Sequence, residues 1–137
     1  MTKKEITDFI KKEISKPSSY NIETILAEKI ETILRRNVFN SRMKDYYDVY
    51  YFLNNLKNEI DKTVLVEAIN NTFSKRNSFE YLSDNEQIIN DIRDSEKIHN
   101  LWNIYSNKYS YAKKIDINDI LNLIENLILE LDIKITI

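Results

Sequence analysis

Apolar residues recur at helical spacing along most of this chain, which predicts a protein built from helices. The clearest stripes lie in residues 21–36 and 42–56, where apolar side chains return every three or four positions. In the first segment they are Ile22, Ile25, Leu26, Ile30, Ile33 and Leu34. In the second they are Met43, Tyr46, Val49, Tyr50, Leu53 and Leu56. The polar stretch "RNVFNS" separates the two helices.

Capping patterns place further helices on either side of this pair. Thr2 and Glu5 form a capping box for a helix over 2–15, which ends at Pro17. Asp61 precedes a stripe that reaches Phe73, and residues 83–86 form another capping box before the apolar run 88–92. The helical spacing then continues to residue 108, with a break near 94. Residues 106–116 are expected to form a loop.

The most apolar stripe lies near the end of the sequence. It begins after Asp116 or Asn118, either of which can cap a helix, and it ends at Leu131. This helix is therefore expected to be central. Residues 132–137 alternate as a strand does but have no partner strand, so we expect an extended tail. The sequence predicts an all-α fold, a single helical bundle of about six or seven helices in one domain, 1–137.

Composition excludes several classes of site. The chain has no glycine, although an average composition of about 7% would give about ten. Phosphate loops, dinucleotide fingerprints and nucleophile elbows need glycine and are excluded. There is no cysteine, and a net charge of -2 gives no global attraction for nucleic acid. No apolar run approaches the ~18 residues of a membrane span, so we expect a cytoplasmic protein without membrane contact.

Lys29 falls within the apolar stripe of its helix, between Leu26 and Ile30. One interpretation is that its stem packs while the ammonium reaches water. The other is that it points into a cleft and holds an anion, because a buried ammonium without a partner is costly. Under that second interpretation, removing the side chain is expected to leave folding nearly intact.

Arg42, Asp45 and Asp48 lie three residues apart and form one ridge along the next helix. Such a ridge is often a row of exposed salt bridges that contributes little to stability. This one borders the buried stripe, where two carboxylates one turn apart can bind Mg²⁺ or take a proton from a hydroxyl.

Aromatic residues give weaker indications. The spacing predicts that Tyr46 and Tyr50 pack in the core, whereas Tyr47 and Tyr51 face another way and could cover an interdomain surface. Lysines at 108, 113 and 114 alternate with tyrosines at 109 and 111, a pattern suited either to RNA or to a plain exposed loop. The lone histidine, at 99, excludes a histidine metal cluster, and the tryptophan at 102 is read as a core anchor.

The stretch "YNIETILAEKIETILRRNVFNSRMKDYYDVYYF" resembles the motif region of the AbiEii/AbiGii family, the nucleotidyltransferase-like toxins of bacterial abortive-infection, type IV toxin–antitoxin systems. The likeness rests on "AEK" followed by Arg-x-Lys-Asp-x-x-Asp, here Arg42, Lys44, Asp45 and Asp48. It continues more weakly through "TFSKR" and "LWNIYSNKYSYA". The resemblance implies the helical carboxy-terminal part of a DNA-polymerase-β-like nucleotidyltransferase that acts on tRNA ends.

By this resemblance Lys29 contacts triphosphate, and Asp45 assists metal binding or proton removal. Arg42, Lys44 and Asp48 then support the site or bind substrate. The family's Gly-Ser loop and Asp-x-Asp pair are absent from the sequence. We therefore expect no cofactor for the chain alone, and Mg²⁺ and NTP only together with a nucleotide-binding half. Three explanations of this absence remain open: the chain is a carboxy-terminal fragment, a split gene product or a decayed homologue.

Two functions follow from these observations. The chain is either the carboxy-terminal half of a toxin, inactive alone, or a non-catalytic helical module that binds an antitoxin, a separate catalytic half or RNA. The partners to consider are a cognate antitoxin, a separate nucleotidyltransferase half, tRNA and a second copy of the chain.

Overall fold

The computed structural model describes residues 2–6 and 21–131, and within this part the chain is helical, without strands. The all-α prediction is confirmed. The elements are α2 (Ile22–Arg36), η1 (Asn37–Phe39), α3 (Met43–Asn55), η2 (Lys57–Glu59), α4 (Lys62–Lys75), α5 (Phe79–Ser83), α6 (Asn85–Arg93), α7 (Glu96–Lys108), η3 (Ser110–Ala112) and α8 (Ile117–Leu131). None of the described helices has the length and apolarity needed to cross a membrane.

Two predicted segments fall wholly or partly outside the described residues. The helix over 2–15 is described only at its start, where the Glu5 amide donates to Thr2 Oγ1 at 3.1 Å. The tail at 132–137 lies outside the described part.

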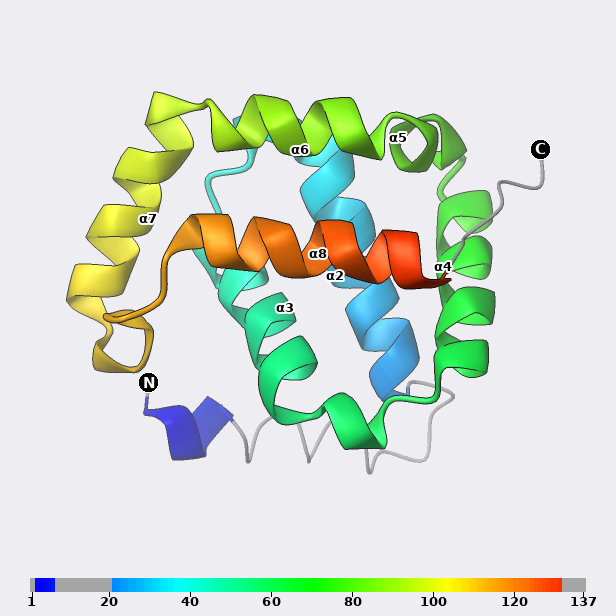
Figure 1. Ribbon diagram of the computed structural model, residues 1–137, viewed down its shortest axis with the longest axis horizontal. Helices are drawn as coiled ribbons and strands as arrows, with labels where there is room; N and C mark the ends of the chain where they lie inside the picture. Colours follow the sequence, from blue (N-terminus) through cyan, green and yellow to red (C-terminus); the bar gives the residue numbers. More distant parts are fainter. Residues whose placement is uncertain (1, 7–20, 132–137) are drawn as a thin grey trace.

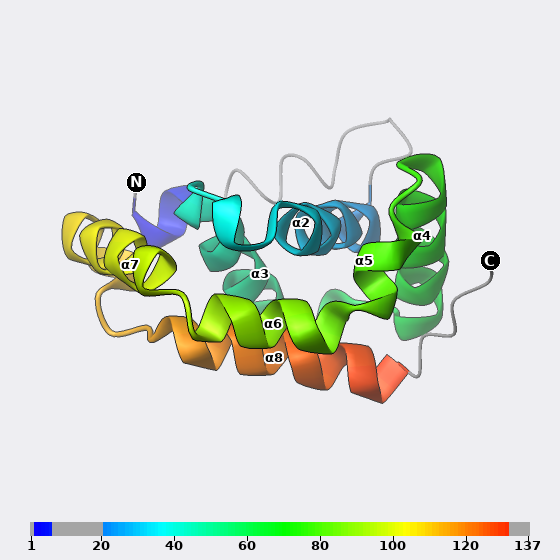
Figure 2. The same cartoon turned by 90° about the horizontal axis from the view of Figure 1, so that it is seen from above.

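The helices α2 and α3 form an antiparallel pair, and α8 crosses over both (Figure 1). Seen from above, α6 and α8 run side by side, while α4 and α7 stand at opposite ends of the molecule (Figure 2). The pairs α2–α3, α2–α4, α3–α8 and α6–α8 are all in contact. The α2–α3 pair is therefore held from several sides, which fixes how its facing side chains meet.

Polar side chains start three of these helices where the sequence predicts it. Asn21 Oδ1 accepts from the Thr24 amide at 2.8 Å, and Asp61 Oδ1 accepts from the Val64 amide at 3.1 Å. A serine at 95 does the same for α7, after the break predicted near 94. Each bond satisfies an amide that a helix start leaves without a partner, a contribution of about 1 kcal/mol.

The capping box predicted at residues 83–86 is wrong. Ser83 is the last residue of α5, a short helix that the sequence analysis missed, and Asp84 precedes α6 without a side-chain cap. The cause is the packing of Phe79 against Phe73, with ring centroids 6.3 Å apart, which draws residues 79–83 into a helical turn. The predicted loop at 106–116 is also partly helical, because α7 runs to Lys108 and η3 follows.

Asparagine takes the backbone conformations that glycine usually adopts. Asn77 has φ 52° at the end of α4, where the Ser78 amide donates to the Phe73 carbonyl at 2.9 Å. Asn37 has φ 53° and ψ -134° at the end of α2. Asparagine adopts positive φ more readily than most residues with a side chain, which explains these positions in a chain without glycine.

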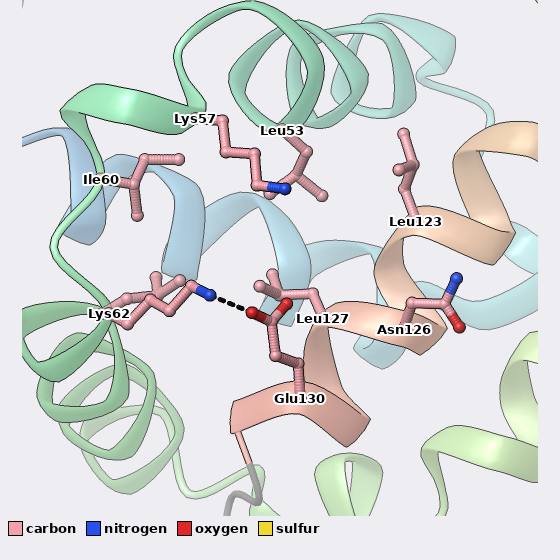
Figure 3. Close-up of a pocket in the computed structure, with 9 residues that line it drawn as sticks. Leu53, Lys57, Ile60, Lys62, Leu123, Asn126, Leu127 and Glu130 are labelled. Carbon is pink, nitrogen blue, oxygen red and sulfur yellow. Dashed lines mark hydrogen bonds and ion pairs between the residues drawn. The ribbon is translucent and has the colours of Figure 1, made fainter.

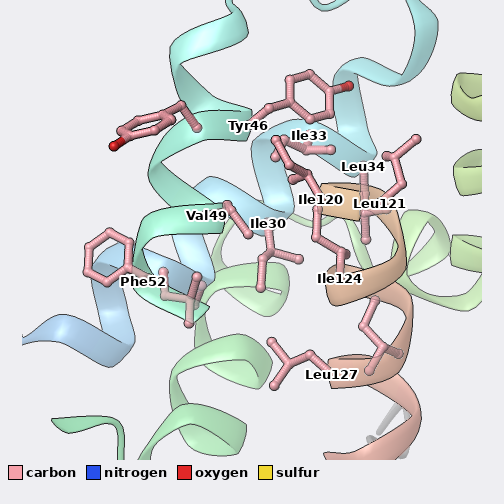
Figure 4. Packing of buried hydrophobic residues seen from close by; sticks show 14 of the residues in the cluster. Ile30, Ile33, Leu34, Tyr46, Val49, Phe52, Ile120, Leu121, Ile124 and Leu127 are labelled. Carbon is pink, nitrogen blue, oxygen red and sulfur yellow. The ribbon is translucent and has the colours of Figure 1, made fainter. Parts of the chain in front are cut away.

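The core forms where α8 meets α2 and α3 (Figure 4). Ile30, Leu34, Val49, Ile120 and Ile124 are each 0% exposed. Burying an aliphatic side chain of this size contributes about 1.5–3 kcal/mol, so this contact area dominates the favourable free energy of folding. The apolar stripes predicted for α2, α3 and α8 thus face one another.

Candidate functional site

Lys29 of α2 lies between two aspartates of α3. Its Nζ is 3.2 Å from Asp45 Oδ1 and 3.3 Å from Asp48 Oδ2. The two aspartates are three residues apart on α3 and so project toward the same side, where the antiparallel α2 presents Lys29. The ammonium is therefore paired with carboxylates, as expected for a lysine that faces the aspartates of the next helix.

Two further cations complete this cluster. Lys44 Nζ lies 3.1 Å from Asp48 Oδ2, and Arg42 Nε lies 3.6 Å from Asp45 Oδ1. The Arg42 side chain is 60% exposed, so water screens its attraction to Asp45. The five residues that carry the resemblance are thus in one place, which we name the Lys29 cluster: Lys29, Arg42, Lys44, Asp45 and Asp48.

Burial separates this cluster from an exposed row of salt bridges. Asp45 and Asp48 are only 2% and 4% exposed. A carboxylate removed from water needs an opposite charge and hydrogen bonds, because its desolvation costs several kcal/mol. The interpretation of the Arg42, Asp45 and Asp48 ridge as an exposed row is therefore wrong, since α2 covers its two acids.

One oxygen of each aspartate has no hydrogen-bond partner in the described part of the chain. These atoms are Asp45 Oδ2 and Asp48 Oδ1, and the hydroxyl of Tyr46, the residue that follows Asp45, also has no partner in the described part of the chain. Burial raises the pKa of the Tyr46 hydroxyl well above its ordinary value of 10.0, and the negative charge of Asp45 raises it further. Buried acceptors without donors are rare in proteins and suit a hydroxyl or amine brought by a ligand.

A cleft of about 280 Å³ opens beside Asp45. Its lining residues are Ile25, Glu28, Lys29, Thr32, Arg36, Arg42, Asp45 and Arg76. Four cations and two acids line this cleft, although Lys29 and Arg76 also pair with Asp48 and Glu31 just outside it. Guanidinium groups match phosphate oxygens in geometry and charge, so the cleft suits a phosphorylated ligand.

Arg76 is a residue of this cleft that the sequence analysis did not identify. It donates from Nη1 to Glu31 at 2.6 Å and from Nη2 to Glu28 at 2.9 Å, which ties the end of α4 to α2. Glu31 is 0% exposed and also pairs with Arg35 at 3.0 Å. The available signal was Glu31 itself, an acid within the apolar side of α2 whose burial demands a cation.

The aspartates do not form a magnesium site by themselves. Among residues 2–6 and 21–131, no group of three or more potential ligands gathers in a way that could hold a metal ion. Asp45 and Asp48 are instead paired with three cations, whereas Mg²⁺ requires oxygen ligands in a near-octahedral arrangement. The residues present therefore do not fit Mg²⁺ as a metal held by these helices alone.

The structure does not bear out the prediction that Tyr47 and Tyr51 cover an interdomain surface, because both are buried within this domain. They are 1% and 4% exposed, whereas Tyr50, expected in the core, is only partly buried. The reason is that α3 is covered on a second side by α7 and η3, where the Tyr111 ring lies 4.5 Å from that of Tyr47. Burial, and secondarily the neighbouring tyrosines and Asp48, raises the pKa of Tyr47.

The remaining aromatic and histidine predictions concern α7. Trp102 is 2% exposed and its Nε1 donates to the Ile115 carbonyl at 2.8 Å, which confirms it as a core anchor. His99 Nε2 donates to the Arg93 carbonyl at 2.8 Å and has a structural role.

A separate apolar pocket of about 190 Å³ lies between α3, α4 and α8 (Figure 3). Leu53, Leu65 and Leu127 are among its lining residues, and an ion pair between Lys62 and Glu130 lies at its edge. The hydrogen bond from Lys62 and its positive charge lower the pKa of Glu130. None of the Lys29 cluster residues lines this pocket.

Comparison with known proteins gives one match. The sequence model of the family described as "Nucleotidyl transferase AbiEii toxin, Type IV TA system" matches residues 4–125. That range covers most of the chain and includes the whole Lys29 cluster. Neither a curated protein nor a solved structure matches the sequence.

Proposed function

Because the chain belongs to the AbiEii family of nucleotidyl transferase toxins from type IV toxin–antitoxin systems, we propose that the Lys29 cluster is the part of a nucleotidyltransferase site supplied by these helices. Family membership implies a cognate antitoxin. One observation carries the proposal: Lys29 Nζ contacts both buried aspartates, while the second Asp45 oxygen is unpaired and Asp45 lines a cationic cleft.

In the proposed reaction an acceptor hydroxyl attacks the α-phosphorus of a nucleoside triphosphate. A bond forms between the hydroxyl oxygen and this phosphorus, the bond to the bridging oxygen breaks, and pyrophosphate leaves. The hydroxyl proton passes to the carboxylate of Asp45, which lines the cleft. Lys29 attracts the phosphate oxygens, and its contact with Asp45 Oδ1 keeps that carboxylate oriented.

The other three residues of the cluster support these two. Asp48 lies 3.3 Å from the Lys29 ammonium and positions it, and Lys44 offsets the charge of Asp48 from the other side. Arg42 stands exposed at the rim of the cleft, where its guanidinium can reach a phosphate. An end of a tRNA is the acceptor that the family resemblance implies.

We infer that the groups that hold nucleotide and Mg²⁺ come from elsewhere, either on the same polypeptide or on a separate one. This 137-residue sequence contains no glycine and no Asp-x-Asp pair. Phosphoryl-type transfer depends on metal bridging and on fixed phosphate positions, so these residues alone leave most of the transition-state charge without stabilisation. The isolated chain is then inactive.

The test is nucleotide transfer to total tRNA, measured as label from an α-phosphate-labelled NTP with Mg²⁺. The isolated chain is expected to give background only, and the chain completed by a nucleotide-binding half is expected to give transfer. In that complex Asp45→Asn should reduce transfer by about 10²–10⁴-fold, the usual contribution of a general base. Asp91→Asn, at an exposed aspartate of α6, is the matched control and should keep full activity.

Transfer by the isolated chain would contradict the divided site. Full activity of a folded Asp45→Asn complex would contradict the role of Asp45. Melting curves of both variants show whether each one is folded.

A non-catalytic helical module is the second candidate, and one observation favours it. Asp45 and Asp48 are already paired with Lys29, Lys44 and Arg42, so both carboxylates have cationic partners without a substrate. Under this function a folded Asp45→Asn variant loses capture of the antitoxin or of a catalytic half, while no variant of the cluster changes nucleotide transfer.

A further inference from the structure

Three lysines that follow the middle of α7 lack the carboxylate partners that Lys29 and Lys44 have. Lys108, Lys113 and Lys114 have no acidic oxygen within 4.0 Å in the described part of the chain. All three are exposed, and they lie within a stretch of seven residues. In a chain of net charge -2, three unpaired cations this close together form a local positive surface.

Tyrosine rings lie between these lysines. Tyr109 stacks on Tyr111 with ring centroids 5.4 Å apart and planes at 29°, and Lys108 Nζ lies 5.4 Å from the centre of the Tyr109 ring. Tyr105 also contacts Tyr109, at 4.8 Å between centroids. Tyr105, Tyr109 and Tyr111 are all only partly buried, so part of this aromatic cluster remains open to a ligand.

This surface adjoins the Lys29 cluster through α3. The Tyr111 ring lies 4.5 Å from the ring of Tyr47, the residue that precedes Asp48. The Tyr105 and Tyr111 hydroxyls are 2.6 Å apart. Burial raises the pKa of both hydroxyls, and the charge of Asp48 contributes, so both rings stay neutral at physiological pH.

A polar hollow of about 400 Å³ lies beside the lysines. Asn103, Asn107 and Asn118 contribute amide groups to its lining, together with Lys113 and Lys114. Amides can donate to and accept from the edges of bases, while lysines attract phosphates without regard to sequence. The hollow therefore offers both kinds of contact next to a stacking ring.

We propose that Lys108, Tyr109, Tyr111, Lys113 and Lys114, here named the lysine–tyrosine surface, bind single-stranded RNA. A base stacks on Tyr109, and the lysines contact the flanking phosphates. Single-strand binding sites combine cations along the backbone with aromatic rings for the bases, and this surface has both. The binding does not depend on the proposed function. Only the role of the bound strand as the acceptor of nucleotide transfer does.

The test measures fluorescence anisotropy of a labelled single-stranded RNA of about twelve nucleotides, within the common site sizes of about 4–16. The full chain is used without NTP. Lys113→Gln/Lys114→Gln should weaken binding and lower the slope of log affinity against log salt by about 1.4, or about 0.7 for each lost phosphate contact. Lys57→Gln/Lys97→Gln removes the same charge from exposed lysines elsewhere and should leave the slope unchanged.

A second pair of variants tests the ring. Tyr109→Leu should weaken RNA binding about tenfold, because stacking on an aromatic ring is lost, and Tyr109→Phe should retain it. Equal weakening in the Lys57/Lys97 control, unchanged binding in Tyr109→Leu, or tighter binding to anionic phospholipid vesicles than to RNA would each overturn the proposal. If the lysine and Tyr109 variants weaken RNA binding as expected but no nucleotide transfer is found, the proposed function is contradicted and this inference is not. If nucleotide transfer depends on Asp45 but RNA binding is unchanged in the lysine variants, this inference is contradicted and the proposed function is not.

Discussion

The Lys29 cluster and the Lys62–Glu130 pair join helices by the same chemistry in opposite surroundings. Lys29 is 23% exposed in its side chain and Asp45 3%, whereas Lys62 and Glu130 are 54% and 50% exposed. Water around an exposed pair already satisfies both charges, so the contact adds little. In the buried pair the helices have removed that water, and each charge depends on the other. Burial, more than the contact itself, determines what a substitution does.

Arg76 and Glu31 lie between these extremes. Glu31 is 0% exposed, but the Arg76 side chain is 34% exposed and Arg35 supplies a second cation to the same carboxylate. The loss of one cation therefore leaves a partner in place. The three sites therefore differ in how deeply the acid is buried and in how many cations contact it.

The largest effect is expected at Lys29. Lys29→Met leaves two buried carboxylates with only Lys44 and the exposed Arg42, so we expect a loss of about 3 kcal/mol in the free energy of unfolding. This reverses the expectation, drawn from sequence, that folding would stay nearly intact. Thermal denaturation would show a fall of roughly 10 °C.

The same site offers its own control. Lys29→Met combined with Asp45→Asn and Asp48→Asn removes the unpaired charges, and stability should largely return, because replacing a whole buried ion network is often neutral. If Lys29→Met is as stable as the native chain, the buried pair does not differ from an exposed one.

A smaller effect is expected at Arg76. Arg76→Met removes the bonds to Glu28 and Glu31 but leaves Arg35 on the buried acid, so we expect a loss of about 1–2 kcal/mol. Urea denaturation measures this change as a lower midpoint at constant slope. A loss equal to that of Lys29→Met would show that Arg35 does not compensate.

The smallest effect is expected at Lys62. Lys62→Met should leave the melting temperature indistinguishable from that of the native chain, since water replaces the ammonium beside the exposed Glu130. Differential scanning calorimetry at low and at high salt provides the check, because a real contribution from this pair would shrink as salt rises. A clear destabilisation by Lys62→Met would contradict the expectation that an exposed ion pair contributes little to stability.

Periodicity and caps predicted much of the fold because both are local. The stripes of α2 and α3 placed Lys29 and the two aspartates on adjoining faces, and Asn21 and Asp61 marked helix starts. Periodicity could not predict on how many sides other elements pack against a helix. Tyr47 lies off the main stripe of α3 and is buried because Tyr111 of η3, 64 residues later in the sequence, packs against it.

Contacts between residues far apart in the sequence were the second feature that could not be predicted. Arg76 meets Glu31 from 45 residues away, a separation at which spacing predicts nothing about contact. Glu31 did carry a signal, since an acid on the apolar side of α2 requires a cation. The sequence indicated that Glu31 requires a cation, but it could not indicate which arginine pairs with it.

The position of α8 in the chain also sets when this protein can fold during its synthesis. Ile120 and Ile124 complete the layer over α2 and α3, yet both are translated long after Lys29, Asp45 and Asp48 have left the ribosome. Until then the nascent helices expose the apolar face that α8 will bury. The apolar layer over α2 and α3 is therefore completed only as a late event of translation, once residues up to Leu131 have emerged.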